Sequence, residues 1–515
     1  MTRMFGYLIA VVVVAAAAVV LLRLLFPLPD ISSRPVSTAI PADIGTRLGG
    51  KTATQAARHP GKSGVTALSD GEDALTSRVA LIDDAEASID AQYYIWHEDT
   101  SGVLLLDALR RAADRGVRVR LLLDDNGVPG LDGYLAALNA RPNFEVRLFN
   151  PSTVRTPKLL GYAFDFPRMN RRMHNKSLIV DGVAAIIGGR NIGNEYFNVG
   201  DAFYMDMDLL AVGAIVPQTA AVFDAYWNSL SVYQIESLIP GPGEMAAFET
   251  RLAAVRASDE ARTVQASFKS SAARYAGGVQ PLEWTDVQLI ADHPAKGQGI
   301  ATEDQLMITR LGAILGAVQS RLDLVSAYLV PGKVGTAYFN DLARSGKDVR
   351  ILTNAMNTTD VLLVHSGYSR YRRALLQAGI KLYELKLRGG VTPESETQLK
   401  PLGLSGASLH AKSFAIDGQR IFIGSFNFDP RSAMLNCEMG FLVDSPAMAA
   451  RVSAAFDGPL DLLSYRPSLT PEHKMVWTEK RPGGEPIVYQ EEPGATWLQQ
   501  FTLVVVGLLP VEWLL

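Results

Sequence analysis

Two stretches of the chain repeat one pattern of reactive residues, His-x-Lys-x₄-Asp-x₆-Gly-[Gly/Ser]-x-Asn. A single His-x-Lys-x₄-Asp arises by chance in roughly one sequence per hundred. Two copies with the same downstream Gly and Asn are therefore a strong signal of shared chemistry. The copies consist of His174, Lys176, Asp181 and Asn191 in the first half, and His410, Lys412, Asp417 and Asn427 in the second.

The spacing of these residues suits a phosphate group. A His and a Lys two positions apart in a strand project from the same face, and the lysine charge lowers the imidazole pKa. If the two pairs meet, lysines and asparagines can donate to phosphate oxygens while one imidazole attacks phosphorus. The other imidazole can protonate the departing alkoxide. Asp181 and Asp417 are candidates for orienting and charge-balancing groups in this site.

The elements around the motifs also occur twice. A strand, a helix that ends at a glycine, and a second strand follow one another in each half, with Gly116 and Gly346 at matching places. Such β-α-β units predict two duplicated α/β domains, each a mixed sheet flanked by helices. The expected elements are 88–96, 102–115 and 117–123 in the first half, and 322–329, 335–345 and 349–353 in the second.

The two ends of the chain differ from this body. Residues 4–22 are an unbroken apolar run, which favours an uncleaved transmembrane anchor over a cleaved signal peptide or a buried core helix. Residues 497–515 are apolar but interrupted, and predict either a membrane-interfacial segment or a packed strand and turn. We expect an anchor (1–29), a linker (30–75), domain 1 (76–240), a connecting helix or linker (241–285), domain 2 (286–470) and a C-terminal tail (471–515).

Composition excludes some classes of protein. The 515 residues carry a net charge of −4, which disfavours a nucleic-acid binder. The single cysteine, Cys437, excludes an internal disulfide and the zinc sites that need several cysteines, and we expect it to be a buried thiol. A metal site at His97-Glu98-Asp99 is disfavoured against an ordinary loop, so no cofactor is expected.

The paired motifs resemble the HKD motifs of the phospholipase D superfamily over about residues 76–470. Within it, the chain is most similar to bacterial cardiolipin synthases of the C-type branch. That finer likeness depends on the segments 94–99 (YIWHED), 170–174 (NRRMH), 364–372 (VHSGYSRYR) and 508–512 (LLPVE).

The resemblance implies that the two motifs meet across a pseudo-twofold axis in one metal-independent site. It makes His174 the nucleophile that forms a phosphohistidine and His410 the general acid/base. Lys176, Lys412, Asn191 and Asn427 would hold the phosphate. Glu438 resembles the downstream acid that steadies a histidine, whereas Asp206-Met-Asp208 in the first half leaves the corresponding partner open.

The implied function is a membrane-associated phosphatidyltransferase that forms cardiolipin. Its substrates would be phosphatidylglycerol and, as a further candidate, phosphatidylethanolamine. It would sit in the bacterial inner membrane on a single N-terminal pass, with the membrane face and oligomeric state left open. The alternatives are a phospholipid hydrolase using the same residues, a nuclease of the superfamily, and an inactive lipid-binding scaffold, which would not need both histidines.

Two further groups of residues allow more than one interpretation. Arg168, Arg171 and Arg172 precede the first motif, and either clamp a headgroup or form a solvated basic loop. His365 either lines the pocket of the second half or lies on a helix surface.

Overall fold

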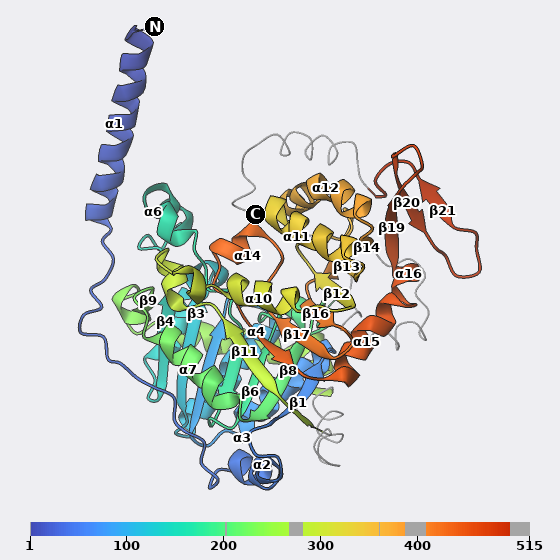
Figure 1. Ribbon diagram of the computed structural model, residues 1–515. Coiled ribbons are helices and arrows are strands. Elements are labelled where there is room, and N and C mark those ends of the chain that lie inside the picture. The colour runs from blue at the N-terminus through green and yellow to red at the C-terminus, as the bar shows by residue number, and fades with distance from the viewer. Residues whose placement is uncertain (1, 201–202, 267–281, 360, 387–407, 495–515) are drawn as a thin grey trace.

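The computed structural model describes residues 2–200, 203–266, 282–359, 361–386 and 408–494. Within these residues the strands form two large sheets and one two-stranded pair. Each large sheet belongs to one repeat of the sequence, and both sheets use the same order of eight strands (Figure 1). The predicted duplication of an α/β domain is confirmed.

The first sheet has a parallel centre, β2-β3-β4, and its other strand pairs are antiparallel. Helices α4 (Thr100–Asp114) and α5 (Asp132–Asn139) make the crossovers that parallel strands require. In spatial order the strands are β10 (Glu283–Thr285), β1 (Ser63–Leu68), β8 (Asp208–Gly213), β6 (Ala184–Gly188), β5 (Ser177–Val180), β2 (Ser88–Tyr93), β3 (Arg118–Asp124), β4 (Phe144–Phe149) and β9 (Val232–Gln234).

The second sheet repeats this plan, with β12-β13-β14 as its parallel centre. Helices α11 (Gly332–Arg344) and α12 (Leu362–Gln377) make the equivalent crossovers. In spatial order its strands are β11 (Val287–Ala291), β18 (Met439–Val443), β17 (Arg420–Gly424), β16 (Lys412–Ile416), β12 (Arg321–Ser326), β13 (Asp348–Asn354), β14 (Lys381–Leu385), β19 (Ser464–Leu469), β20 (Met475–Glu479) and β21 (Ile487–Tyr489).

The two sheets share one apolar core. Ile179 and Ile187 of the first half and Ala415 and Ile423 of the second belong to the same buried cluster. Separate clusters lie under the outer helices of each half. The remaining helices are α2 (Arg47–Arg58), α3 (Gly71–Asp84), α6 (Tyr162–Met169), α7 (Val216–Trp227), α8 (Met245–Ala257), α10 (Met307–Gly316), α14 (Pro430–Met434), α15 (Pro446–Phe456) and α16 (Leu460–Leu463).

A buried ion pair recurs at equivalent places of the two sheets. Arg120 Nε donates to Asp90 at 2.6 Å, and Arg350 Nε donates to Asp323 at 2.5 Å. All four side chains are almost wholly buried, so each charge depends on its partner for compensation. The repeat therefore extends to the polar interior of each domain.

Two of the expected boundaries are wrong. The predicted linker (30–75) contains α2, β1 and the start of α3, and β1 pairs along its whole length with β8. The predicted tail (471–515) contains β20 and β21, which extend the second sheet. Both segments contain Pro, Gly and polar residues, but their short strands gain hydrogen bonds from the neighbouring strands of the sheets that they join. The apolar segment 497–515 lies outside the described residues.

The connecting segment (241–285) contains helix α8, as expected, and β10, which pairs with β1 at the edge of the first sheet. Residues 267–281 of this segment lie outside the described residues.

Helix α1 (Thr2–Leu25) projects from the body (Figure 1). Its stretch Arg3–Leu25 has a mean hydropathy of 3.0 and no buried part, which contradicts a core helix and fits a membrane-spanning one. At 1.5 Å per residue it is about 36 Å long, enough to cross the hydrocarbon layer of a bilayer.

Candidate active site

Each motif histidine lies just before a core strand and is fixed by the backbone of the other half. The His174 N–H donates to Cys437 O at 2.8 Å, next to the isolated bridge between Met173 and Cys437. The His410 N–H donates to Met205 O at 2.8 Å. This second contact lies beside the parallel pair β7 (Tyr204–Met205) and β15 (Ser408–Leu409). Backbone hydrogen bonds therefore join the two halves at both motifs, at equivalent positions.

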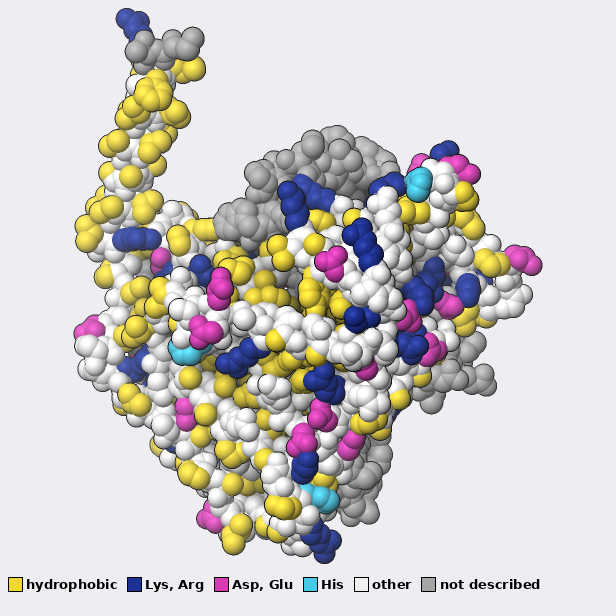
Figure 2. Space-filling view, in the orientation of Figure 1, with side chains coloured by type: hydrophobic (Ala, Val, Ile, Leu, Met, Phe, Trp, Pro, Cys, Tyr) yellow, Lys and Arg dark blue, Asp and Glu magenta, His cyan; other side chains and the backbone are white. Residues whose placement is uncertain are grey.

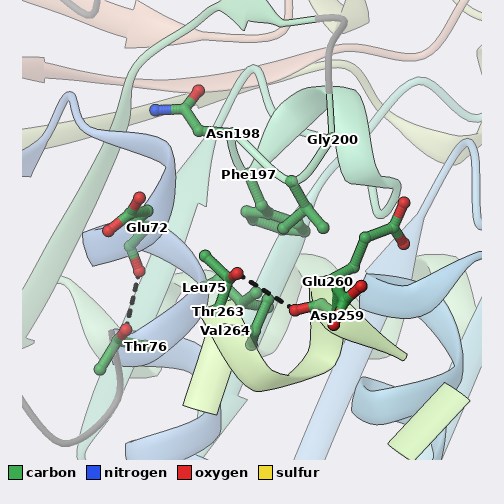
Figure 3. Close-up of a pocket in the computed structure, with 11 residues that line it drawn as sticks. Glu72, Leu75, Thr76, Phe197, Asn198, Gly200, Asp259, Glu260, Thr263 and Val264 are labelled. Carbon is green, nitrogen blue, oxygen red and sulfur yellow. Dashed lines mark hydrogen bonds between the residues drawn. The ribbon is translucent and has the colours of Figure 1, made fainter. Parts of the chain in front are cut away.

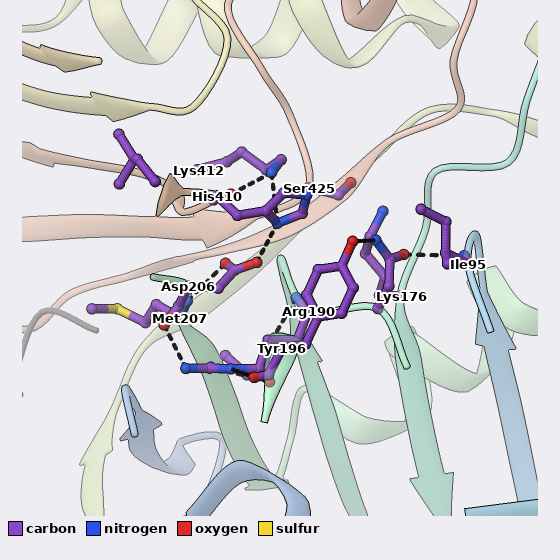
Figure 4. Close-up of polar contacts among 12 residues, drawn as sticks. Ile95, Lys176, Arg190, Tyr196, Asp206, Met207, His410, Lys412 and Ser425 are labelled. Carbon is purple, nitrogen blue, oxygen red and sulfur yellow. Dashed lines mark hydrogen bonds and ion pairs between the residues drawn. The ribbon is translucent and has the colours of Figure 1, made fainter. Parts of the chain in front are cut away.

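The carboxylates that support the histidines are exchanged between the halves. His174 Nδ1 lies 2.8 Å from Glu438 Oε2. His410 Nδ1 lies 2.5 Å from Asp206 Oδ2, a contact that Figure 4 shows. A carboxylate at Nδ1 fixes the ring and leaves Nε2 as the reactive nitrogen. Glu438 thus contacts a histidine, as the resemblance led us to expect, and the acid that contacts the other histidine is Asp206. Asp208 instead pairs with the buried Arg78 at 2.8 Å.

Both motif lysines are buried beside their histidines. Lys176 Nζ donates to His174 O at 2.6 Å, and Lys412 Nζ donates to His410 O and lies 3.1 Å from its Nδ1. Burial lowers the pKa of Lys176 well below its usual value, and the charge of Lys412 contributes to this shift. The two lysines are therefore close enough to interact, and an anionic group between them would relieve their repulsion.

The histidines share one electrostatic environment. Burial, followed by the charges of Lys176 and Lys412, lowers the pKa of His174 well below its usual value, and His410 adds to the effect. Burial and Lys412 also lower the pKa of His410, whereas Asp206 opposes the shift. Both imidazoles are thus favoured in the neutral form, and the motifs converge on one place.

The two supporting carboxylates differ in charge. Burial raises the pKa of Glu438 to about 7. Although burial also acts on Asp206, the nearby His410 and Lys412 lower its pKa to about 2. At neutral pH, Asp206 is ionised, while Glu438 is close to its titration midpoint.

The residues beneath these two carboxylates also differ. Ser425 Oγ donates to Glu438 Oε2 at 2.5 Å. The equivalent position in the first half is Gly189, where a Cβ atom would lie 2.1 Å from Asp206 Oδ1. The shorter acid requires a glycine beneath it, whereas the longer acid is held by a hydroxyl group. This accounts for the [Gly/Ser] variation in the repeated motif.

The two motif asparagines are both buried but differ in their contacts. Asn191 Oδ1 accepts from the Ile95 N–H at 3.2 Å, and its Nδ2 donates to Tyr196 Oη at 2.9 Å. Asn427 Oδ1 has no hydrogen-bond partner among the described residues. Asn191 therefore spends much of its amide on fixing the strand end and a tyrosine. The prediction that both asparagines hold phosphate stays a prediction.

The two motif aspartates do not orient the histidines, and this prediction is wrong. Asp181 accepts from the backbone N–H groups of residues 86–88, at the start of β2. Asp417 accepts from those of residues 319–321, at the start of β12. Each aspartate sits in a turn at positive φ, +53° and +54°, and is followed by a glycine, also at positive φ. The Asp-Gly pair is a hairpin-turn signal that the sequence already contained.

Three tyrosines surround the imidazoles, and none of them is among the site residues expected from the motifs. The Tyr94 ring lies edge-on to His174 with centroids 5.1 Å apart, and Lys176 Nζ lies 5.4 Å from the same ring. Tyr196 lies edge-on to His410 at 5.1 Å, and Tyr204 stacks on it at 5.3 Å. These rings limit the rotation of the imidazoles and exclude water from their flanks.

The arginines before the first motif are structural. Arg172 is buried, lies 3.1 Å from Asp124 and donates to Asn150 O. Arg171 bonds to Met434 O at 3.1 Å and so ties the first half to the second. Arg172 therefore neither clamps a lipid headgroup nor lies in a solvated basic loop.

His365 is buried and lies 2.5 Å from Glu492, close to the end of the described chain. Arg372 donates to the same carboxylate at 2.8 Å. His365 is therefore neither a pocket residue nor a surface residue, because it fixes the chain beyond β21 to α12.

His97, Asp99 and Glu195 bring potential metal-ligand atoms within 4.8 Å of one another. His97 Nδ1 lies 3.1 Å from Glu195, while Asp99 accepts from the N–H groups of Gly102 and Asn194. An ion pair and a helix cap therefore account for these three groups.

A cavity of about 290 Å³ lies away from the histidines (Figure 3). None of its lining residues belongs to a motif. It lies between α3, residues 197–200 and residues 259–264, and Glu72, Asp259 and Glu260 give it an acidic rim. It is therefore not the site assembled by the motifs.

Comparison with known proteins agrees with this architecture. The family described as "Cardiolipin synthase, PLD-like domain" matches residues 79–227 and again 311–459. Cardiolipin synthase C of Escherichia coli (strain K12) is 42% identical over 467 residues, which cover 89% of this chain and 97% of that protein. A cardiolipin synthase of Listeria monocytogenes (serotype 4a, strain HCC23) is 25% identical over 405 residues, covering 78% and 69%. A crystal structure of phosphatidylserine synthase from Haemophilus influenzae Rd KW20 shares the fold, with a TM-score of 0.57, 14% identity and coverage of 90% and 100%.

Proposed function

Because the chain belongs to the cardiolipin synthase family with PLD-like domains, we propose that it forms cardiolipin by transferring a phosphatidyl group to phosphatidylglycerol. The chain is a phosphatidyltransferase of the phospholipase D superfamily. The observation that carries the proposal is the convergence of two buried imidazoles, each held by a carboxylate from the opposite half.

The first step breaks the bond between phosphorus and the headgroup alcohol of the donor lipid. Nε2 of His174 attacks phosphorus and forms a phosphohistidine, while His410 gives its proton to the departing alkoxide. Phosphatidylglycerol and phosphatidylethanolamine are both candidate donors, releasing glycerol or ethanolamine. Lys176 and Lys412, with Asn191 and Asn427, stabilise the negative charge on the non-bridging oxygens.

In the second step, a new alcohol attacks phosphorus in place of the headgroup alcohol that left in the first step. His410, now neutral, takes the proton from a hydroxyl of phosphatidylglycerol, whose oxygen attacks the phosphohistidine. The P–N bond breaks, cardiolipin leaves and His174 returns to its neutral form. No metal or other cofactor takes part in either step.

The unequal carboxylates support this order of the histidines. The ionised Asp206 favours the protonated form of His410, as a general acid requires. His174 has a less ionised partner and two nearby lysines, which favour the neutral form of a nucleophile.

The proposed location is the bacterial inner membrane, with α1 as a single-pass anchor. The length, hydropathy and exposure of α1 support this proposal. An apolar anchor keeps the body at the surface where both lipid substrates are found. The membrane face and the oligomeric state are not part of the proposal.

The test uses the full chain in vesicles of labelled phosphatidylglycerol, with and without phosphatidylethanolamine. The expected product is cardiolipin. Phosphatidic acid as the main product would instead identify a hydrolase with water as acceptor. His174→Ala and His410→Ala should each reduce turnover at least 10³-fold while leaving thermal unfolding unchanged. Near-normal activity of either variant would contradict the two-histidine mechanism.

A chemical trap tests the covalent step. When the reaction is quenched at alkaline pH, the parent chain should carry an acid-labile label from the phosphatidyl donor. His174→Ala should carry none. Label on the His174→Ala chain, lost in His410→Ala, would exchange the proposed roles of the two histidines.

A further inference from the structure

We propose that the segment formed by η2 (Lys158–Gly161) and α6 (Tyr162–Met169), here called the α6 arm, docks into the headgroup layer of the bilayer beside α1 and admits lipid to the histidines. The docking depends only on the anchor, whereas the admission of lipid rests on the proposed function.

The arm exposes large apolar side chains in adjacent positions. Leu159 is 73% exposed, Leu160 54% and Phe166 39%. Single exposed apolar residues are ordinary on soluble proteins, but three within eight residues are a local concentration of apolar surface that water does not favour. The patch is too small for a stable protein–protein interface but suits shallow insertion between lipid headgroups.

The position of the arm identifies what covers this patch. Arg23, in the last turn of α1, donates through Nε to Phe164 O at 2.9 Å and lies 3.6 Å from Asp165. The rings of Phe26 and Phe164 lie 6.1 Å apart. If α1 spans the bilayer, its end lies at the headgroup level, so the arm that contacts it lies there too (Figure 1).

The surface of the molecule fits this placement. Figure 2 shows hydrophobic side chains along α1 and basic side chains at its base, where it reaches the body. Met434, 56% exposed at the end of α14, lies near the C-terminal end of the arm, because Arg171, two residues beyond the arm, bonds to its carbonyl oxygen. Arg431 of the same helix donates to Asn170 at 2.9 Å. The second half therefore adds one exposed apolar side chain near the C-terminal end of the arm.

The arm also reaches the site. Tyr162 Oη lies 3.4 Å from Asn126 Oδ1. Burial raises the pKa values of Tyr94 and Tyr162. The charges of Asp124 and Arg431 act on both tyrosines, so the two rings lie near the same charged groups. Tyr94 in turn contacts the His174 ring. The arm thus borders the His174 side of the site, and α14 follows directly from Asn427, so lipid entering between them would approach both histidines.

The first test measures depth with a fluorophore on the full chain. The native Cys437 is buried and burial raises its pKa to about 12, so labelling of an added surface cysteine is selective. Leu159→Cys reports on the arm and Val14→Cys on α1. Ile44→Cys is the control, because Ile44 is 77% exposed but precedes α2, at the opposite end of the body (Figure 1).

In vesicles of phosphatidylglycerol and phosphatidylethanolamine, we expect a headgroup-level quencher to reduce the Leu159→Cys signal at least threefold more than the Ile44→Cys signal. The Val14→Cys label should respond to a quencher deep in the acyl chains. If Val14→Cys responds and Leu159→Cys behaves like Ile44→Cys, the arm does not dock and the inference is wrong. If Val14→Cys does not respond, the proposed anchor itself is wrong, and the arm proposal falls with it.

The second test measures turnover. Leu159→Glu/Leu160→Glu should raise the apparent KM for vesicle lipid about 10-fold, because charged side chains oppose insertion. Its kcat on lipid dispersed in detergent should match the parent, and Ile44→Glu should change neither value. Equal KM values for the double variant and the parent would contradict a role of the arm in lipid entry. Loss of cardiolipin formation by the parent itself would contradict the proposed function instead.

Discussion

At the residue scale, the two histidines are chemically alike, but their partners are not. Glu438 is supported by the Ser425 hydroxyl and has a pKa near 7, whereas Asp206 sits over Gly189 and is ionised. A duplicated site would be expected to treat both imidazoles equally. In the proposed mechanism, the different acids allow one imidazole to act as nucleophile and the other to carry the proton.

The role of Asp206 can be tested through pH. Asp206 raises the pKa of His410, so Asp206→Asn should lower that pKa. Because the proposed first step needs protonated His410, activity falls as pH rises through its pKa. The basic limb of the kcat–pH profile should therefore shift to lower pH, and kcat at pH 8 should fall about 100-fold. A profile that is lower but not shifted would indicate a purely structural role.

Glu438 should lower the free energy of unfolding at neutral pH, although it supports catalysis. Its folded pKa is raised, so the folded state binds the proton more tightly than the unfolded state does. The resulting penalty is absent below about pH 4.5 and complete above about pH 7, where it amounts to at most roughly 3 kcal/mol.

Glu438→Gln removes this penalty but weakens the orientation of His174. The difference in Tm, variant minus parent, should therefore increase by a few degrees as the pH is raised from 4.5 to 8. Thermal unfolding in detergent measures it. Turnover should fall about 10- to 100-fold. A Tm difference that does not change with pH would contradict the raised pKa.

At the element scale, the hairpins β5–β6 and β16–β17 place the reactive residues. Lys412 begins the strand before the second turn, and Lys176 directly precedes the strand before the first turn. The strand after each turn leads to the asparagine. The turn aspartate accepts hydrogen bonds from the backbone at the start of β2 or β12, the neighbouring strand in the parallel centre of the sheet. It therefore fixes the hairpin against that centre.

Asp181→Ala should destabilise the chain by roughly 3 kcal/mol, because it leaves buried backbone N–H groups without an acceptor. Asp417→Ala should cost less, since Asp417 is only half-buried and water can replace it. Thermal unfolding of both variants measures the difference. Turnover per folded molecule should stay within about threefold of the parent in both cases, and a 100-fold loss would return these residues to the catalytic set.

The repeated elements and the position of both motifs could be predicted from the sequence, because periodicity and glycine stops are local signals. The family resemblance indicated that Glu438 steadies a histidine. Which histidine each acid contacts could not be predicted, because Glu438 and Asp206 reach histidines more than 200 positions away in the chain. Sequence spacing also gave Asp181 a catalytic role, although its Asp-Gly turn fixes it to the backbone. The strands β1, β20 and β21 were missed because such short strands depend on the sheet that they join.

At the scale of the whole molecule, neither half contains a complete site. His174 lies in the first half and its acid in the second, while the reverse holds for His410. The shared core adds a large apolar contact between the halves. We therefore expect the halves to need each other both for stability and for chemistry.

This dependence can be measured by dividing the chain between residues 266 and 282. Each fragment expressed alone should show less than about 1% of the parent turnover, because each would contain one histidine without its acid. Co-expression should restore cardiolipin formation in a 1:1 complex. Activity of the second fragment alone would show that the carboxylate exchange is unnecessary.

The exchanged carboxylates also bear on the ancestry of the chain. An ancestral half on its own could have worked only as a homodimer, in which one acid position served both histidines. In such a dimer, any mutation at that position altered both imidazoles at once. Fusion of two gene copies separates the positions, so a Glu above a Ser and an Asp above a Gly can be inherited side by side. The division of labour between attacker and proton carrier is therefore open to selection only after the fusion.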